Sequence, residues 1–201
     1  PSLYNLACDD LLSPNFAVLG TGRSKLSNEA FRSSMASETT GLRAFHTRHA
    51  FEEVVSDALL SRFFFESAII DIESFKGLKK TVQALDKKYQ AGGNILFYFA
   101  MAARFFGALC ENLYKAGFQE GSGWKRIIVE KPFGTNLQSA LALNQEILQY
   151  WKEEQIYRVD HYLGKETVQN LLAFRFSNGM FEPLWNKHHI DNIQFNVCEA
   201  V

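Results

Sequence analysis

The sequence has 201 residues, of which 47% are hydrophobic and 21% charged, a composition typical of a globular protein rather than a disordered chain. Its 21 Lys and Arg residues against 22 Asp and Glu residues give a net charge of −1, which excludes the basic excess expected of a nucleic-acid-binding or acidic-membrane-binding protein. The three cysteines, Cys8, Cys110 and Cys198, are far apart and form no CxxC pair. We therefore expect reduced thiols, without a disulfide framework or a structural zinc site.

The most apolar stretch, residues 95–110, is interrupted by Arg104 and is too short for a membrane-spanning helix, and no signal peptide is recognisable. We expect a cytoplasmic protein with no nucleic-acid or membrane partner. The sequence enters a patterned segment directly after Pro1 and stops at Val201 within a predicted strand. The expectation is that both ends are cut from a longer chain.

Short apolar runs alternate with helical patterns along the first half of the chain. A run that ends at a glycine is typical of a buried parallel strand, and apolar residues at helical spacing indicate covering helices. The predicted elements, in order, are a strand over 15–20, helical segments over 27–32 and 45–64, a strand over 67–71, and a helix over 74–90 closed by Gly92 and Gly93.

The second half continues the alternation and then changes character. A strand over 95–99, a helix over 103–116, a strand over 126–129, a helix over 135–154 that starts at Thr135 or Asn136, and a strand over 155–160 are predicted. Such alternation favours an α/β fold with a mostly parallel, doubly wound sheet. A helix over 166–176 and an alternating strand over 190–199 belong to a different sheet pattern, so we place a domain boundary near residue 158.

Arg23 is the first candidate functional residue. It follows the strand over 15–20, and Lys25 is close behind it. In dinucleotide-binding folds an acid near the end of the second strand selects NAD, whereas an arginine accommodates the additional phosphate of NADP. An ordinary solvated cation after a strand is the simpler interpretation of Arg23 taken alone.

Lys131 is the second candidate, in the segment Ile127-Ile-Val-Glu-Lys-Pro-Phe-Gly134. A strand over 126–129 would present this lysine at its carboxyl end, where open α/β sheets bind ligands, so that Lys131 could touch both cofactor and substrate. Pro132 would stiffen the turn and could take a cis peptide bond. A turn with a solvated lysine is the simpler alternative.

The strongest candidate is the segment Arg158-Val-Asp-His-Tyr-Leu-Gly-Lys-Glu166. His161, Tyr162 and Lys165 could converge on a phosphate as hydrogen-bond donors. Asp160 could instead orient a catalytic histidine and stabilise its imidazolium form. Any one of these residues could serve only a helix start, but the whole cluster favours a functional site.

The motifs at 130–134 and 157–166 together resemble the signature pair of glucose-6-phosphate dehydrogenases, and the resemblance extends over essentially all 201 residues. It implies a partial Rossmann-like NADP-binding domain over 1–157, without its first strand and glycine-rich loop, and the beginning of an α+β substrate-binding domain over 158–201. It also implies hydride transfer from C1 of glucose 6-phosphate to NADP, which gives 6-phosphogluconolactone in the oxidative pentose phosphate pathway. No metal is implied, and a dimer or tetramer is expected of the full-length enzyme.

The resemblance assigns roles to individual residues. His161, Tyr162, Lys165 and Glu199 would bind the sugar phosphate, Lys131 would contact both substrate and coenzyme in a catalytic position, and Arg23 would bind the 2′-phosphate of NADP. Asp160 would be the partner of the catalytic histidine, which lies beyond this sequence in the family. The chain alone is therefore expected to be inactive.

Some features fit the family pattern less well. His188 and His189 match no catalytic position, and Ala102-Ala103 stands where the family usually has two prolines near the coenzyme, next to a possible contact at Phe106. Two alternatives stay open: another NADP-dependent sugar oxidoreductase resembling glucose-fructose oxidoreductase, and a non-catalytic relative that binds a sugar phosphate or a subunit.

Overall fold

The computed structural model describes residues 1–37, 41–44 and 47–196. Its contacts divide the chain into two compact units, Pro1–Tyr157 and Arg158–Val201. No described helix is both long enough and apolar enough to cross a membrane.

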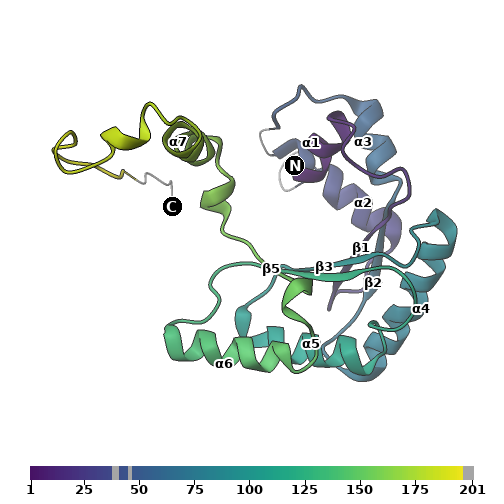
Figure 1. Ribbon diagram of the computed structural model, residues 1–201. Helices are drawn as coiled ribbons and strands as arrows, with labels where there is room; N and C mark the ends of the chain where they lie inside the picture. The colour runs from purple at the N-terminus through teal and green to yellow at the C-terminus, as the bar shows by residue number, and fades with distance from the viewer. Residues whose placement is uncertain (38–40, 45–46, 197–201) are drawn as a thin grey trace. The chain divides into compact units, whose positions relative to one another are not determined.

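The first unit alternates strands with helices, as the sequence predicts (Figure 1). Its elements are α1 (Ser2–Cys8), β1 (Val18–Gly22), α2 (Asn28–Ala36), α3 (Glu53–Leu60), β2 (Phe63–Ser67), α4 (Ile72–Tyr89), β3 (Ile95–Phe99), α5 (Phe106–Lys115), β4 (Lys125–Val129), α6 (Leu137–Leu148) and β5 (Ile156–Arg158), with short 3-10 turns at Leu42–Ala44, Ala103–Phe105 and Glu153–Gln155.

The strands form two sheets instead of one continuous sheet. Strands β1 and β2 pair in parallel, and β3, β4 and β5 form a second sheet in that order, with β3 and β4 parallel. A dinucleotide-binding sheet has the strand order 3-2-1-4-5-6. The two sheets correspond to positions 3-2 and 4-5-6 of that order, so the α/β doubly wound class is confirmed for the described strands.

Each sheet has its own hydrophobic core. The larger cluster combines the buried face of β3, β4 and β5 with residues of α4, α5 and α6, and α5 and α6 lie on the same side of this sheet in Figure 1. At its centre Trp151 is 2% exposed and donates its indole N–H to the carbonyl oxygen of Cys110 at 3.2 Å. Burial of one such large side chain stabilises the fold by about 1.5–3 kcal/mol.

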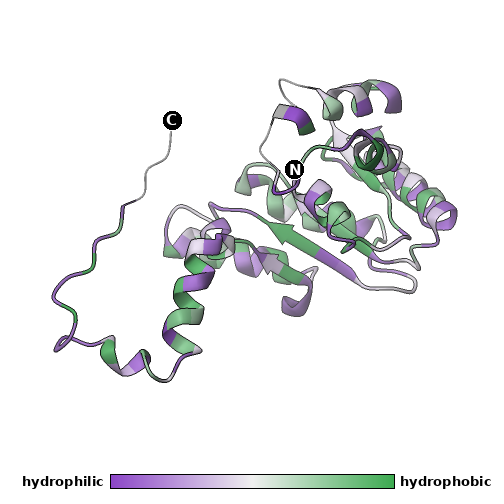
Figure 2. Ribbon diagram, turned by 90° about the horizontal axis from the view of Figure 1, so that it is seen from above, coloured by the Kyte–Doolittle hydropathy of each residue, from purple (hydrophilic) through white to green (hydrophobic). Residues whose placement is uncertain are grey.

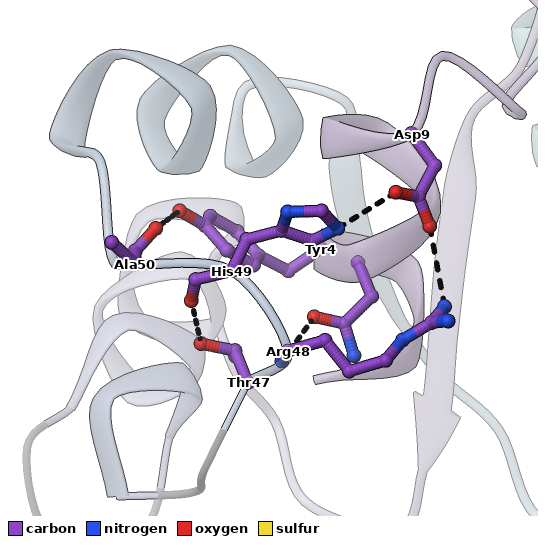
Figure 3. A network of polar contacts seen from close by, with 7 residues as sticks. Tyr4, Asp9, Thr47, Arg48, His49 and Ala50 are labelled. Atoms are coloured by element: carbon purple, nitrogen blue, oxygen red, sulfur yellow. Dashed lines mark hydrogen bonds and ion pairs between the residues drawn. The ribbon is translucent and has the colours of Figure 1, made fainter. Parts of the chain in front are cut away.

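Tyr4 lies at the centre of the smaller core, which α1 and α3 share with β2. Figure 3 shows the polar contacts around this tyrosine. Its side chain is fully buried; its hydroxyl donates to the carbonyl oxygen of Ala50 at 2.9 Å and accepts from the backbone N–H of Glu52 at 2.7 Å. Nearby, the Asp9 carboxylate contacts Nε2 of His49 at 2.7 Å and Nη2 of Arg48 at 3.2 Å. These contacts tie α1 to the segment that leads into α3.

Polar side chains cap three of the helices at their amino ends. The side-chain oxygens of Ser27, Asp71 and Asn136 accept backbone N–H groups three residues along the chain at 3.1, 2.8 and 2.9 Å. Each such cap contributes about 1 kcal/mol. The prediction that the last of these helices begins at Thr135 or Asn136 is confirmed, since Asn136 is the capping residue.

Two predicted strands differ from the structure. The strand expected over 67–71 lies earlier, at β2, because Asp71 is required as the cap of α4 and the three consecutive phenylalanines from Phe63 pair with β1. The strand expected over 190–199 is absent from its described part, residues 190–196. A strand needs a hydrogen-bonding partner, and none of the described strands pairs with this segment.

The second unit contains a 3-10 turn over His161–Gly164, the helix α7 (Glu166–Phe176) and a 3-10 turn over Glu182–Leu184. Apolar residues occur along the whole of α7 (Figure 2), but the helix has no buried residue. Its Phe174 stacks on Phe181 with ring centroids 4.4 Å apart. The fold of this unit therefore depends on local contacts.

Candidate functional site

The segment after β4 makes a corner that core packing fixes at its two ends. Val129 is 1% exposed in the larger core, and Phe133 packs against the same core four residues later. Gly134 then has φ +86°, and a Cβ there would lie 2.6 Å from the backbone nitrogen of Ala140. Glu130, Lys131 and Pro132 are exposed between these fixed points, at the carboxyl end of β4, and the Lys131–Pro132 peptide bond is cis.

Tyr98 contacts this corner from the neighbouring strand. Its hydroxyl donates a hydrogen bond to Oε1 of Glu130. This hydrogen bond is the main reason that the pKa of Tyr98 is raised to about 12, with burial and the charge of the Glu130 carboxylate adding to it. Sequence reasoning missed this tyrosine, because its contact with Glu130 depends on the register of β3 against β4, in which Tyr98 pairs with Ile128, two residues before Glu130.

Arg23 lies exposed immediately after β1, followed by Ser24 and Lys25. Two contacts of α2 with the strands position this turn. Phe31 packs so closely over Gly20 that a Cβ on Gly20 would lie 2.5 Å from the Phe31 ring. Nε of Arg32 donates to the carbonyl oxygen of Phe63 at 2.8 Å. An exposed guanidinium and an exposed ammonium two positions apart, in the turn after a strand, could bind a phosphate.

The aspartate-to-lysine cluster of the second unit is gathered at the start of α7. The rings of His161 and Tyr162 lie 4.5 Å apart, and the Lys165 ammonium lies 4.3 Å from the centroid of the Tyr162 ring. Asp160 caps the 3-10 turn, and its Oδ1 accepts the backbone N–H of Tyr162 at 3.2 Å. Three side chains with donor groups are thus close together, and one carboxylate is held beside them.

The remaining predicted residues are placed as follows. Arg23 and Lys131 lie at the ends of strands in different sheets, and Glu199 lies outside the described residues. Phe106 is 1% exposed and packs on Phe99 with ring centroids 5.7 Å apart. Phe106 is therefore a core residue in this structure and not a surface contact for a coenzyme.

Other polar features lie away from these residues. A pocket of about 170 Å³ lies at the amino ends of β3 and β4, opposite the corner that carries Lys131, and its lining includes Lys79, Asp86 and Lys125. Burial lowers the pKa of Lys125, whose ammonium donates to backbone carbonyls of the preceding loop. Among the described residues, no group of three or more His, Cys, Asp or Glu could hold a metal ion.

The sequence matches two family models. Residues 1–170 match the model described as "Glucose-6-phosphate dehydrogenase, NAD binding domain", and residues 172–201 match "Glucose-6-phosphate dehydrogenase, C-terminal domain". The first model alone covers more than half of the chain.

Curated relatives and solved structures agree with these matches. The chain is 42% identical over 202 residues to glucose-6-phosphate 1-dehydrogenase of Streptococcus pneumoniae and 38% identical over 204 residues to glucose-6-phosphate 1-dehydrogenase 2 of Mycobacterium tuberculosis; in both cases all of the chain is covered, but only 39% of the relative. A structure titled "Glucose-6-phosphate dehydrogenase in complex with its substrate glucose-6-phosphate" matches with a TM-score of 0.79 and 33% identity, covering 94% of this chain and 38% of that one. The structure of glucose-6-phosphate 1-dehydrogenase from Mycobacterium avium matches with a TM-score of 0.71 and 29% identity, covering 93% of this chain and 38% of that one.

Proposed function

The chain belongs to the glucose-6-phosphate dehydrogenase family, and we propose that it supplies the coenzyme side and the start of the sugar side of an enzyme that oxidises glucose 6-phosphate with NADP. Because the chain spans about two fifths of the curated relatives that it matches, the activity is proposed for a protein of family length that contains it. Residues 1–157 would form the partial NADP-binding domain and residues 158–201 the beginning of the substrate-binding domain.

The observation that carries this proposal is the grouping of His161, Tyr162 and Lys165 at the start of α7. An imidazole, a phenol and an ammonium can all donate to phosphate oxygens, and the ammonium adds charge-assisted hydrogen bonds. We assign the sugar phosphate to these three side chains. Glu199 is proposed as a further sugar ligand on the family resemblance alone.

Arg23 and Lys131 are proposed to serve the coenzyme. Arg23 fits the 2′-phosphate of NADP because it is exposed at the end of a strand, with Lys25 beside it and no acid in the turn from Arg23 to Ser27. Lys131, at the end of β4, would contact both the nicotinamide side and the sugar. Bound NADP would accept the hydride, while the lysine holds the reacting groups in position.

Asp160 is proposed as the partner of a catalytic histidine outside this chain. One of its carboxylate oxygens accepts the backbone N–H of Tyr162, which limits rotation of the carboxylate. A carboxylate held in this way can fix the tautomer of an imidazole and stabilise its protonated form as the sugar hydroxyl loses its proton.

The test is Lys165→Ala in the family-length protein. We expect KM for glucose 6-phosphate to rise by about ten- to a hundredfold, since a hydrogen bond to a charged group contributes about 1.5–3 kcal/mol. KM for NADP should stay unchanged. Lys187→Ala, which removes an exposed charge from the same unit, is the matched control, and an unchanged KM in Lys165→Ala would contradict the phosphate assignment.

We also propose a cytoplasmic location and a homo-oligomer for the family-length protein. Cys8 and Cys110 are free thiols in the described part of the chain, and free thiols are usual in reducing compartments. Cell fractionation and light scattering of the purified protein would test the two proposals.

A further inference from the structure

The contact between Tyr98 and Glu130 follows from the register of β3 and β4. Tyr98 pairs with Ile128 in the parallel ladder. Residues two positions apart on a strand point to the same face, so Glu130 follows Ile128 on the face that Tyr98 occupies. The hydroxyl of Tyr98 reaches the Glu130 carboxylate from there.

Glu130 is the first residue of the corner that carries Lys131. The corner is fixed at both ends by core packing of Val129 and Phe133, whereas its three middle residues are exposed. The hydrogen bond from Tyr98 therefore adds a side-chain restraint to a segment that packing alone does not hold.

We propose that Tyr98 is a positioning residue for Lys131, acting through Glu130 to keep the lysine in place at the carboxyl end of β4. The inference rests on the proposed function, because the restraint affects the reaction only if Lys131 contacts the coenzyme and the sugar. A displacement of about 1 Å in a group that orients a reaction can cost about a hundredfold in rate. Tyr98 itself need not touch either substrate.

The hydrogen bond can be measured in the 201-residue chain without any activity. NMR of the chain labelled with 13C-tyrosine measures the titration of Tyr98, whose resonance is assigned because Tyr98→Phe removes it. This resonance should titrate with a pKa of about 12, and Glu130→Gln should lower that pKa toward 10. Because the folded-state pKa is raised above 10, the pair's contribution to stability is complete below pH 10 and is lost as the pH rises toward 12. A pKa of Tyr98 that stays the same in Glu130→Gln would contradict the hydrogen bond between these two residues.

The positioning role is tested by kinetics of the family-length protein. Tyr98→Phe should lower kcat/KM by about tenfold or more, but in a Lys131→Ala background the same change should have no further effect, because the tyrosine acts through the lysine. A general structural role would lower kcat/KM again in that background. Tyr114→Phe, on α5 and half exposed, is the control and should leave the kinetics unchanged.

The outcomes separate the two proposals. A family-length protein that does not reduce NADP with glucose 6-phosphate would overturn the proposed function, and the role of Tyr98 with it. An active protein in which Tyr98→Phe has unaltered kinetics, or in which its effect persists unchanged without Lys131, would overturn the positioning role alone.

Discussion

Tyr4 shows how much one buried hydroxyl contributes at the scale of a residue. Its hydroxyl donates to the carbonyl oxygen of Ala50 and accepts from the backbone N–H of Glu52, so Tyr4→Phe would remove two hydrogen bonds that this buried side chain makes. We expect the free energy of unfolding to fall by about 1–3 kcal/mol, measured by urea denaturation.

Tyr114→Phe is the matched control for that prediction. Tyr114 is half exposed, and its ring contact with Tyr150, with centroids 5.6 Å apart, survives the change. Its effect should lie within about 0.5 kcal/mol. Equal effects of the two substitutions would show that the hydrogen bonds of Tyr4 do not stabilise the smaller core.

Individual candidate residues could be predicted from the sequence where a motif keeps them close together along the chain. His161, Tyr162 and Lys165 lie within five residues, so a single turn brings their side chains together. Tyr98 and Glu130 are 32 positions apart, and only the register between β3 and β4 makes them neighbours. Because the register between two strands cannot be read from the sequence, the contact could not have been predicted.

At the scale of elements, capping residues were more informative than apolar runs. Asn136 marks the start of α6 because its side chain satisfies a backbone N–H that the helix cannot. The run that begins at Phe63 overlaps the helical segment predicted over 45–64, yet it forms β2. A short apolar run on a buried parallel strand has no alternation, so its period cannot distinguish strand from helix.

Gly134 lies between β4 and α6, where a substitution should lower the stability of the fold. With φ +86° and the backbone of Ala140 in the way, Gly134→Ala should destabilise the protein by about 1–2 kcal/mol or more. Because this glycine ends the corner that carries Lys131, the substitution should also weaken NADP binding.

Gly77→Ala provides a control with the opposite sign. Gly77 lies within α4, and a Cβ there meets nothing within 4 Å. Alanine should therefore stabilise the helix by about 0.5–1 kcal/mol. Thermal unfolding of both variants measures the difference, and a loss of stability in Gly77→Ala similar to that in Gly134→Ala would contradict the steric explanation.

At the scale of the whole molecule, the alternation of strands and helices predicted the class of fold but not the division into two sheets. Strands β1 and β3 each pair on one edge only among the described strands, although Leu19 of β1 packs against the larger core. In a sheet of order 3-2-1-4-5-6, the strand numbered 1 lies between these two positions. Hydrophobic patterning reports which residues are buried, but not which strands exchange hydrogen bonds.

The same division leads to a prediction about activity. The first strand of a dinucleotide-binding sheet carries the glycine-rich loop that cradles the pyrophosphate, and the described strands include no counterpart of it between β1 and β3. The 201-residue chain by itself should therefore bind NADP weakly and produce no NADPH from glucose 6-phosphate, as followed by absorbance at 340 nm. A family-length protein containing the same residues should produce it under identical conditions. Turnover by the pure chain, abolished by Lys131→Ala, would show that these residues suffice for catalysis and would contradict the role proposed for a histidine partner of Asp160.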